Sequence, residues 1–304
     1  MSFTSKRTAD FCKNILESSS LEIGFVDVGS GGALKAPWSF LPEGALKKFN
    51  VEPTQEDREN SFICISNNCL NKVFNVANDE RASSLHLPSH QFVERFGQQG
   101  MLTHHTLNVQ CLTLDKYLAD NHMTVDAVDI NVEGHDLQVL QGSSALLSGG
   151  VVKLLKIEFE LAQAWIGQGW FGDIESLMRK FDFELVDIAI DFARPESVKN
   201  LHVKGEPVWG KAFFMPSINL LKKNIDLMPP EQARASLLKF ITLAVAAEQP
   251  GRALDIFSIP RIPFSTEEVK KIKTDILNIY KYSKVDAGAS LLFKLAKGII
   301  GFKK

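Results

Sequence analysis

The chain has 304 residues, a hydrophobic fraction of 45% and a formal net charge of -2 at pH 7. This composition is typical of a globular protein with a substantial core, and the length favours one large domain with an accessory region. The small net charge provides no broad attraction for nucleic acid or for an anionic membrane, so we expect neither as a partner.

The cysteines and the N-terminal residues indicate a cytoplasmic protein. None of Cys12, Cys64, Cys69 and Cys111 belongs to a CxxC pair, and no nearby histidine has the spacing of a zinc ligand. We therefore expect reduced thiols and no metal site. The first residues contain no apolar signal segment, and no stretch reaches the roughly 18 apolar residues of a spanning helix.

The first part of the chain predicts a helix followed by a strand and a glycine turn. Residues 4–20 have the periodicity of a helix, and residues 23–28 form an apolar run that contains Asp27 and leads into Gly29, Ser30 and Gly31. Glycines after a strand let a ligand approach the backbone closely, because no Cβ atom blocks it. A plain connection between two elements remains the alternative.

A second strand is predicted to end at an acidic residue. Residues 49–51 are followed by Glu52 and Pro53, and Glu52 lies 25 positions after Asp27. In nucleotide-binding α/β folds, an acid about 20 residues beyond the glycine turn accepts hydrogen bonds from ribose hydroxyls. An acid before a proline also fits an ordinary strand end.

The next region predicts short strands and then a long irregular segment. Residues 62–65 and 72–77 have strand patterns, whereas residues 78–110 are polar and without clear periodicity, which favours a functional or lid region. We interpret its histidines as scattered surface residues, because their spacing does not fit a metal site. These histidines are His86, His90, His104 and His105.

The most informative stretch is a buried strand that turns polar and opens a helix. After a strand at 107–112 and a helix with Thr113 as its cap, an apolar run leads through Asp129, Asn131 and Glu133 to His135. A helical pattern then continues to about residue 147. Because ligands of open α/β sheets bind outside the carboxyl ends of strands, we predict a site here, with a solvated loop as the alternative.

The rest of the chain completes the sheet and then becomes helical. We expect strands at 151–159, 183–190 and 211–215 and a helix at 174–180. The loop before that helix contains Trp165, Trp170 and Phe171, which could stack on a sugar or merely cover the sheet. This alternation predicts a doubly wound, mostly parallel α/β sheet over residues 21–215. It follows an N-terminal helix within residues 1–20 and precedes an all-helical extension over residues 216–304. The last helix, from about 286, could lie on a membrane surface, but we favour packing against its own domain.

Several of these stretches, in order, resemble the FkbM family of S-adenosylmethionine-dependent methyltransferases over about residues 20–215. The similarity rests on residues 25–29 (Phe-Val-Asp-Val-Gly), 51–53 (Val-Glu-Pro), 82–85 (Ala-Ser-Ser-Leu), 112–115 (Leu-Thr-Leu-Asp), 132–142 (from Val-Glu-Gly-His-Asp to Gln-Gly), 171–174 (Phe-Gly-Asp-Ile) and 209–214 (Trp-Gly-Lys-Ala-Phe-Phe). The resemblance implies a Rossmann-like sheet of the class I methyltransferase type and S-adenosylmethionine as cofactor.

The chain departs from the family signature at the presumed site. That signature usually reads Lys-x-Asp-x-Glu-Gly, and here Asp129 stands at the Lys position and Asn131 at the Asp position. The first replacement changes the local charge by two units. Asn131 can still form hydrogen bonds, but it cannot act as a general base.

The resemblance leads to a set of roles. Glu52 would bind the ribose hydroxyls, and the turn with Asp27, Gly29, Ser30 and Gly31 would approach the methionine part of the cofactor. Asp129 would also lie at the cofactor, and together with Asn131, Glu133 and His135 it would form the edge that faces the methyl group and the acceptor. Of these, Glu133 and His135 are the candidates for acceptor binding or proton removal; the alternative is an acid at a helix N-terminus with a solvated neighbour.

The implied reaction is O-methylation of a sugar or natural-product hydroxyl, with surface polysaccharide biosynthesis as the first choice of context. Two alternatives remain open. One is a methyltransferase-like domain without activity that serves as a binding or scaffold module. The other, a nicotinamide-dependent dehydrogenase, is disfavoured because Leu34 occupies the position of the third glycine in G-x-G-x-x-G.

Overall fold

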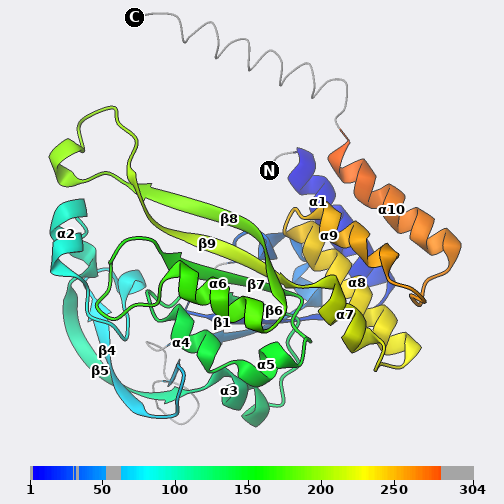
Figure 1. Ribbon diagram of the computed structural model, residues 1–304, viewed down its shortest axis with the longest axis horizontal. Helices are drawn as coiled ribbons and strands as arrows, with labels where there is room; N and C mark the ends of the chain where they lie inside the picture. The colour runs from blue at the N-terminus through cyan, green and yellow to red at the C-terminus, as the bar shows by residue number, and fades with distance from the viewer. Residues whose placement is uncertain (1–2, 30, 32–33, 53–62, 282–304) are drawn as a thin grey trace, which may run out of the picture.

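The structure is a computed structural model that describes residues 3–29, 31, 34–52 and 63–281 (Figure 1). It confirms a mixed α/β architecture with a mostly parallel central sheet and, within these residues, ten α-helices. The helix predicted from about residue 286 lies outside the described residues. Among the described helices, none has the length and the apolar character that crossing a membrane would require.

The central sheet has six strands, and its inner strands are apolar because they are covered on both faces. In spatial order the strands are β2 (Leu46–Val51), β1 (Ile23–Val28), β6 (Ala127–Ile130), β7 (Leu154–Glu160), β9 (Glu206–Pro216) and β8 (Phe183–Ala193). Every residue of β1, β6 and β7 is buried. The first four strands run parallel, whereas β9 is antiparallel to both β7 and β8. The carboxyl ends of β1, β2 and β6 therefore meet at one edge of the sheet.

A second, smaller sheet corrects the prediction for residues 62–110. Its strands are β3 (Ile63–Ile65), β5 (Thr103–Leu112) and β4 (Asn71–Ala77), in that spatial order. Residues 78–110 are thus not irregular, because they contain α2 (His90–Phe96) and most of β5. The strand β5 was predicted only from residue 107 because its first half carries exposed polar residues, among them His104 and His105.

One face of the central sheet is covered by four short helices. These are α3 (Leu114–Asp120), α4 (Asp136–Gln141), α5 (Ser144–Ser148) and α6 (Phe171–Lys180), and they share a hydrophobic cluster with strand residues such as Val26 and Ile157 (Figure 1). The single helix predicted to reach residue 147 is divided at Gly142. A Cβ atom at Gly142 would lie 2.2 Å from the carbonyl oxygen of Ser66, so the close approach of that loop requires glycine.

The other face is covered by helices from both ends of the chain. Helix α1 (Phe3–Ser18) and helix α8 (Pro230–Ala246) share a second hydrophobic cluster with Phe25 of β1, and α7 (Ile218–Ile225), α9 (Pro250–Asp255) and α10 (Thr266–Tyr280) extend this layer (Figure 1). Asp126 joins α8 to the sheet. Its carboxylate accepts hydrogen bonds from Lys239 Nζ at 2.7 Å, Lys153 Nζ at 2.9 Å and the Gly24 amide at 3.0 Å.

Candidate active site

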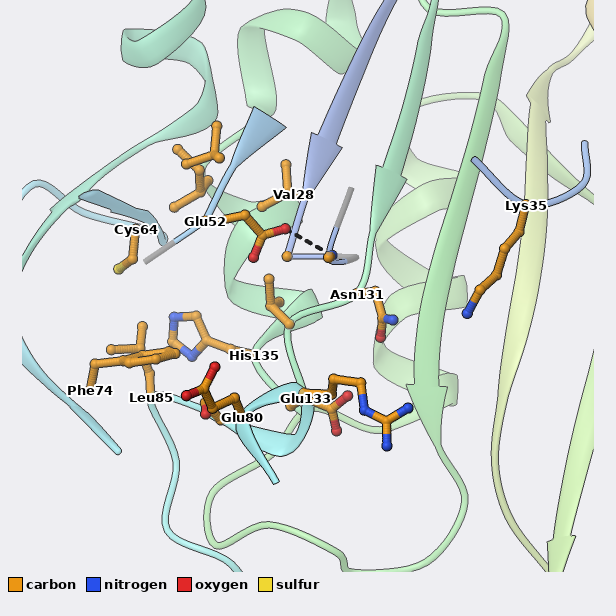
Figure 2. A pocket seen from close by; sticks show the side chains of 17 residues that line it. Val28, Lys35, Glu52, Cys64, Phe74, Glu80, Leu85, Asn131, Glu133 and His135 are labelled. Carbon is orange, nitrogen blue, oxygen red and sulfur yellow. Dashed lines mark hydrogen bonds between the residues drawn. The ribbon is translucent and has the colours of Figure 1, made fainter. Parts of the chain in front are cut away.

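A cavity of about 490 Å³ opens where β1, β2 and β6 end (Figure 2). Its walls combine the glycine turn, the polar end of β6 and the smaller sheet. The lining residues are Val28, Gly29, Gly31, Lys35, Val51, Glu52, Cys64, Ile65, Phe74, Glu80, Arg81, Ser83, Leu85, Asn131, Val132, Glu133 and His135. The structure thus brings six of the nine predicted site residues together, Asn131 among them, while Ser30 lies outside the described residues.

The glycine turn after β1 is shaped by two left-handed residues. Gly29 has a φ of +79° and Gly31 a φ of +74°, and L side chains rarely adopt this conformation. A Cβ atom at Gly29 would lie 2.5 Å from the Asn131 carbonyl oxygen. A Cβ atom at Gly31 would meet no atom within 4 Å, so a side chain there would extend into open space beside the cavity that Gly31 lines.

Glu52 holds this turn from the end of the neighbouring strand. It follows Val51, the last residue of β2, and its Oε1 atom accepts a hydrogen bond from the Gly31 amide at 2.8 Å (Figure 2). Burial raises the pKa of Glu52; the Gly31 amide opposes the shift, the charge of Asp27 adds to it, and the charge of Lys48 opposes it. Glu52 is thus a cavity-lining acceptor fixed through one of its two oxygens.

The two aspartates predicted to bind the cofactor do not line the cavity. Asp27 is buried and forms an ion pair with Lys48 at 3.6 Å. Asp129 Oδ2 lies 2.7 Å from Lys156 Nζ and accepts a hydrogen bond from Trp38 Nε1, also at 2.7 Å. Both aspartates lie two or more residues before the turn that reaches the cavity, where neighbouring side chains cover them.

Asp129 therefore has a different environment from the one the sequence suggested. Burial raises the pKa of its carboxyl, although the charge and hydrogen bond of Lys156 and the hydrogen bond from Trp38 oppose the shift. The expected change of two charge units at the site is offset, because Lys156 supplies the positive charge from the adjacent strand β7.

Asn131 lines the cavity and also contacts β7. With its amide nitrogen assigned toward that strand, it donates hydrogen bonds to the carboxylate of Glu158. Burial raises the pKa of Glu158 to about 7; the charges of Lys211 and Lys156 lower it, and the charge of Asp129 raises it. Asn131 can thus orient a carboxylate, but its amide has no base function.

Glu133 lies in a sharp turn at the cavity wall. It has a φ of 53° and is followed by Gly134 with a φ of 84°. A Cβ atom at Gly134 would lie 2.5 Å from Cδ1 of Trp165, which packs on this turn. Burial raises the pKa of Glu133 well above its usual value; the charges of Glu158 and Asp136 add to the shift, and that of Lys211 opposes it. The side chain of Glu133 is directed to the cavity (Figure 2).

His135 is held at both ring nitrogens. Its Nε2 lies 2.9 Å from Ser66 Oγ, and its Nδ1 lies 3.0 Å from Nε2 of His86. Burial, followed by the charges of His86 and Lys72, lowers the pKa of His135 to about 3, so the ring is neutral at pH 7.

The donors in this chain can be assigned from Lys72. Its Nζ donates to Ser66 Oγ at 2.7 Å, so the Ser66 hydroxyl can donate to His135 Nε2, its closer acceptor. His135 then carries its proton on Nδ1 and donates it to His86. Neither ring nitrogen of His135 is left for an acceptor molecule, which separates its role from that of Glu133.

The model of the methyltransferase FkbM domain matches residues 32–185, which is half of the chain. The chain belongs to the FkbM methyltransferase family. Neither the search of curated proteins nor the search of solved structures gave a match to it.

The FkbM match and the structure cover the site differently. The match includes Glu52, the stretch from Asp129 to His135 and the Ser83–Ser84 segment. It begins after β1 and Gly31 and ends before β9, so the sequence resemblance at residues 25–29 and 209–214 lies outside it. The structure nevertheless places Gly29 and Gly31 in the same cavity as the matched residues.

Sequence reasoning missed three residues that support the FkbM site. His86 was interpreted as a surface histidine, but it is half-buried and bonded to His135, whereas His90, His104 and His105 are exposed. Ser66 and Lys72 were not singled out. No local pattern connects these residues with His135, because they come from the smaller sheet and the segments beside it. Within the described residues, no group of three or more His, Cys, Asp or Glu is arranged to hold a metal ion.

Proposed function

We propose that this FkbM-family protein is an S-adenosylmethionine-dependent O-methyltransferase that acts on a hydroxyl of a sugar or natural-product skeleton. The observation that carries the proposal is the hydrogen bond between the Gly31 amide and Glu52, which closes one end of a cavity that has Glu133 at the other. Surface polysaccharide biosynthesis in the cytoplasm is the context that we propose for this reaction.

The residues at the glycine turn fit the cofactor. Gly29 and Gly31 leave backbone exposed where a side chain would clash or fill space, and the second oxygen of Glu52 can accept from ribose hydroxyls. When bound, S-adenosylmethionine supplies an electrophilic methyl group on a sulfonium. The role of the protein is to bind the cofactor so that this methyl group would point toward the cavity wall that carries Glu133.

Glu133 is the best candidate in this structure for removing the acceptor proton. It lines the cavity, and its raised pKa makes the carboxylate a stronger base once it is ionised. Asn131, beside it, would orient the acceptor or Glu158 by hydrogen bonds. Besides proton removal, the rate enhancement of methyl transfer would come from holding the acceptor oxygen in line with the methyl group.

We assign His135 a positioning role. Because Ser66 and His86 occupy its ring nitrogens, His135 can keep the Glu133–Gly134 turn and the cavity wall in place without itself accepting the proton. The Glu133 carbonyl is also held in place, since it accepts a hydrogen bond from Ser84 Oγ at 2.6 Å.

The proposal is tested by calorimetric titration of the full chain with S-adenosylmethionine and, separately, with NAD. We expect micromolar binding of the first alone, and Glu52→Gln should weaken it about 10- to 100-fold, because a charge-assisted hydrogen bond is worth roughly 1.5–3 kcal/mol. Glu43→Gln is the matched control, since Glu43 is exposed and does not line the cavity.

Turnover is then measured by mass spectrometry with a panel of hydroxylated sugars. No binding of S-adenosylmethionine would contradict the proposal. Binding without methylation of any acceptor would favour the non-catalytic alternative. If Glu133→Gln and His135→Ala both left methylation unchanged, the assignment of these two residues would be wrong.

A further inference from the structure

A second cavity, of about 230 Å³, adjoins the first. The two cavities share Glu133 and Arg81 in their walls. The second is lined by carboxylates and aromatic side chains, namely Asp79, Glu133, Glu158, Glu160, Trp165 and Trp209, together with Arg81, Ala82, Gln98 and Met101. An acceptor held at Glu133 in the first cavity is therefore adjacent to the second.

The second cavity has an excess of negative groups. Its lining contains one cationic side chain among the described residues, Arg81, and this guanidinium is bonded to Asp79 through Nε at 3.0 Å and Nη2 at 2.8 Å. Glu133, Glu158 and Glu160 remain; the charge of Lys211 acts on Glu133 and Glu158, and Glu158 also accepts from Asn131, whereas Glu160 has neither within the described parts of the chain. Their pKa values are raised by burial first, and each also feels the charge of neighbouring carboxylates.

Glu160 is the group that most clearly lacks a partner. Its side chain lines the cavity although the residue is only 3% exposed. In the part of the chain that the structure describes, its carboxyl group forms no ion pair and no hydrogen bond with the side chain of another residue. A carboxylate buried in this way is costly unless a cation or a donor compensates it.

The walls around Glu160 suit a cation. Glu160 is the last residue of β7, and its partner on the antiparallel strand β9 is Trp209. Trp165, which packs on Gly134, also lines the cavity. An ammonium group donates three hydrogen bonds, which three carboxylates can accept, and the faces of tryptophan rings attract cations.

We propose that the second cavity binds a primary ammonium group of the methyl acceptor, so that the substrate is an amino sugar or another alcohol that carries an amine. This inference rests on the proposed function. The acceptor hydroxyl lies beside Glu133, and the ammonium group lies between Glu158 and Glu160. A neutral N-acetylated substrate would supply no positive charge to favour the ionised forms of these carboxyl groups, whose pKa values are raised.

The test compares the full-length protein's affinity for three matched sugars at pH 7, measured by calorimetry in the presence of S-adenosylhomocysteine. The probes are glucosamine, N-acetylglucosamine and glucose. We expect glucosamine to bind at least about tenfold more tightly than the other two, because only it forms charge-assisted hydrogen bonds with the carboxylates. The variant Glu160→Gln should remove this preference, whereas the exposed control Glu94→Gln should retain it.

The outcomes separate this inference from the proposed function. Equal affinity for the three sugars, or no measurable binding of glucosamine, would overturn the ammonium site even if S-adenosylmethionine binds. Preference for glucosamine in a protein that does not bind S-adenosylmethionine would keep the site and overturn the proposed reaction. The comparison of sugars on the unaltered protein does not depend on the folding of any variant.

Discussion

Replacing Lys156 by methionine tests whether Asp129 is a buried structural acid. The two charged atoms lie 2.7 Å apart, and the side chains are 7% and 3% exposed. Methionine keeps most of the apolar stem of lysine but removes the charge. Among the described residues, Asp129 then retains the side-chain hydrogen bond from Trp38 alone, and a buried charge that loses its partner costs about 3–5 kcal/mol.

Protonation limits this cost and gives it a pH dependence. A carboxyl with an unfolded pKa near 3.9 can become neutral at pH 7 for about 4 kcal/mol, so Lys156→Met should lower the free energy of unfolding by about 3–4 kcal/mol. The folded pKa of Asp129 is raised above the unfolded value, and loss of Lys156 raises it further. A raised folded pKa means that neutral Asp129 stabilises the folded protein fully below about pH 4, the unfolded pKa, and that this stabilisation is lost as the pH rises toward the folded pKa. The penalty should shrink by about 1.4 kcal/mol for each pH unit below 7.

Urea unfolding of the full chain at pH 5 and pH 7 measures this effect. The exposed Lys180→Met serves as a control and should change stability by less than about 0.5 kcal/mol. In the double variant Asp129→Asn/Lys156→Met, the amide oxygen still accepts from Trp38, and at least half of the lost stability should return. A loss below about 1 kcal/mol at pH 7, or strictly additive single effects, would refute the structural assignment.

Two further predictions concern the turn at the cavity. Gly134→Ala should destabilise the protein by about 2–5 kcal/mol in urea unfolding, because a left-handed alanine costs about 1–2 kcal/mol and Trp165 must also move; Gly172→Ala, which would meet no atom within 4 Å, should not destabilise it. Glu133→Gln should lower kcat about 100-fold or more without changing the calorimetric Kd for S-adenosylmethionine. In the unaltered protein kcat should rise with pH through the raised pKa of Glu133, since only the ionised carboxylate accepts a proton, and a pH-independent kcat would contradict the base assignment.

The central sheet could be predicted because its strands are short apolar runs. β1, β6 and β7 are buried on both faces, so their sequences have nearly continuous hydrophobic patterns. The glycine turn and Glu52 were also accessible, because each follows its strand directly in sequence. The smaller sheet was harder, since exposed polar residues such as His104 interrupt the pattern of β5.

The side-chain partners in the site could not be predicted from local patterns. His86 is 49 positions from His135, and Lys156 is 27 positions from Asp129. These contacts depend on which strands are neighbours and on how far each residue lies from the strand end. Asp129 lies within β6 and Asn131 directly follows its last residue, yet of the two Asn131 alone lines the cavity, because Trp38 and Lys156 cover Asp129.

The strand order has a practical consequence for work with shortened proteins. The matched segment, residues 32–185, contains β2, β6 and β7 but neither β1, which pairs between β2 and β6, nor β9, which pairs with β7. A gene fragment cut at the limits of sequence similarity would thus encode a sheet with its middle strand missing and with unpaired edges on both sides. It would also lack Lys239, whose ammonium group helps to neutralise Asp126. Expression, crystallisation and directed evolution of this protein therefore have to start from the long chain.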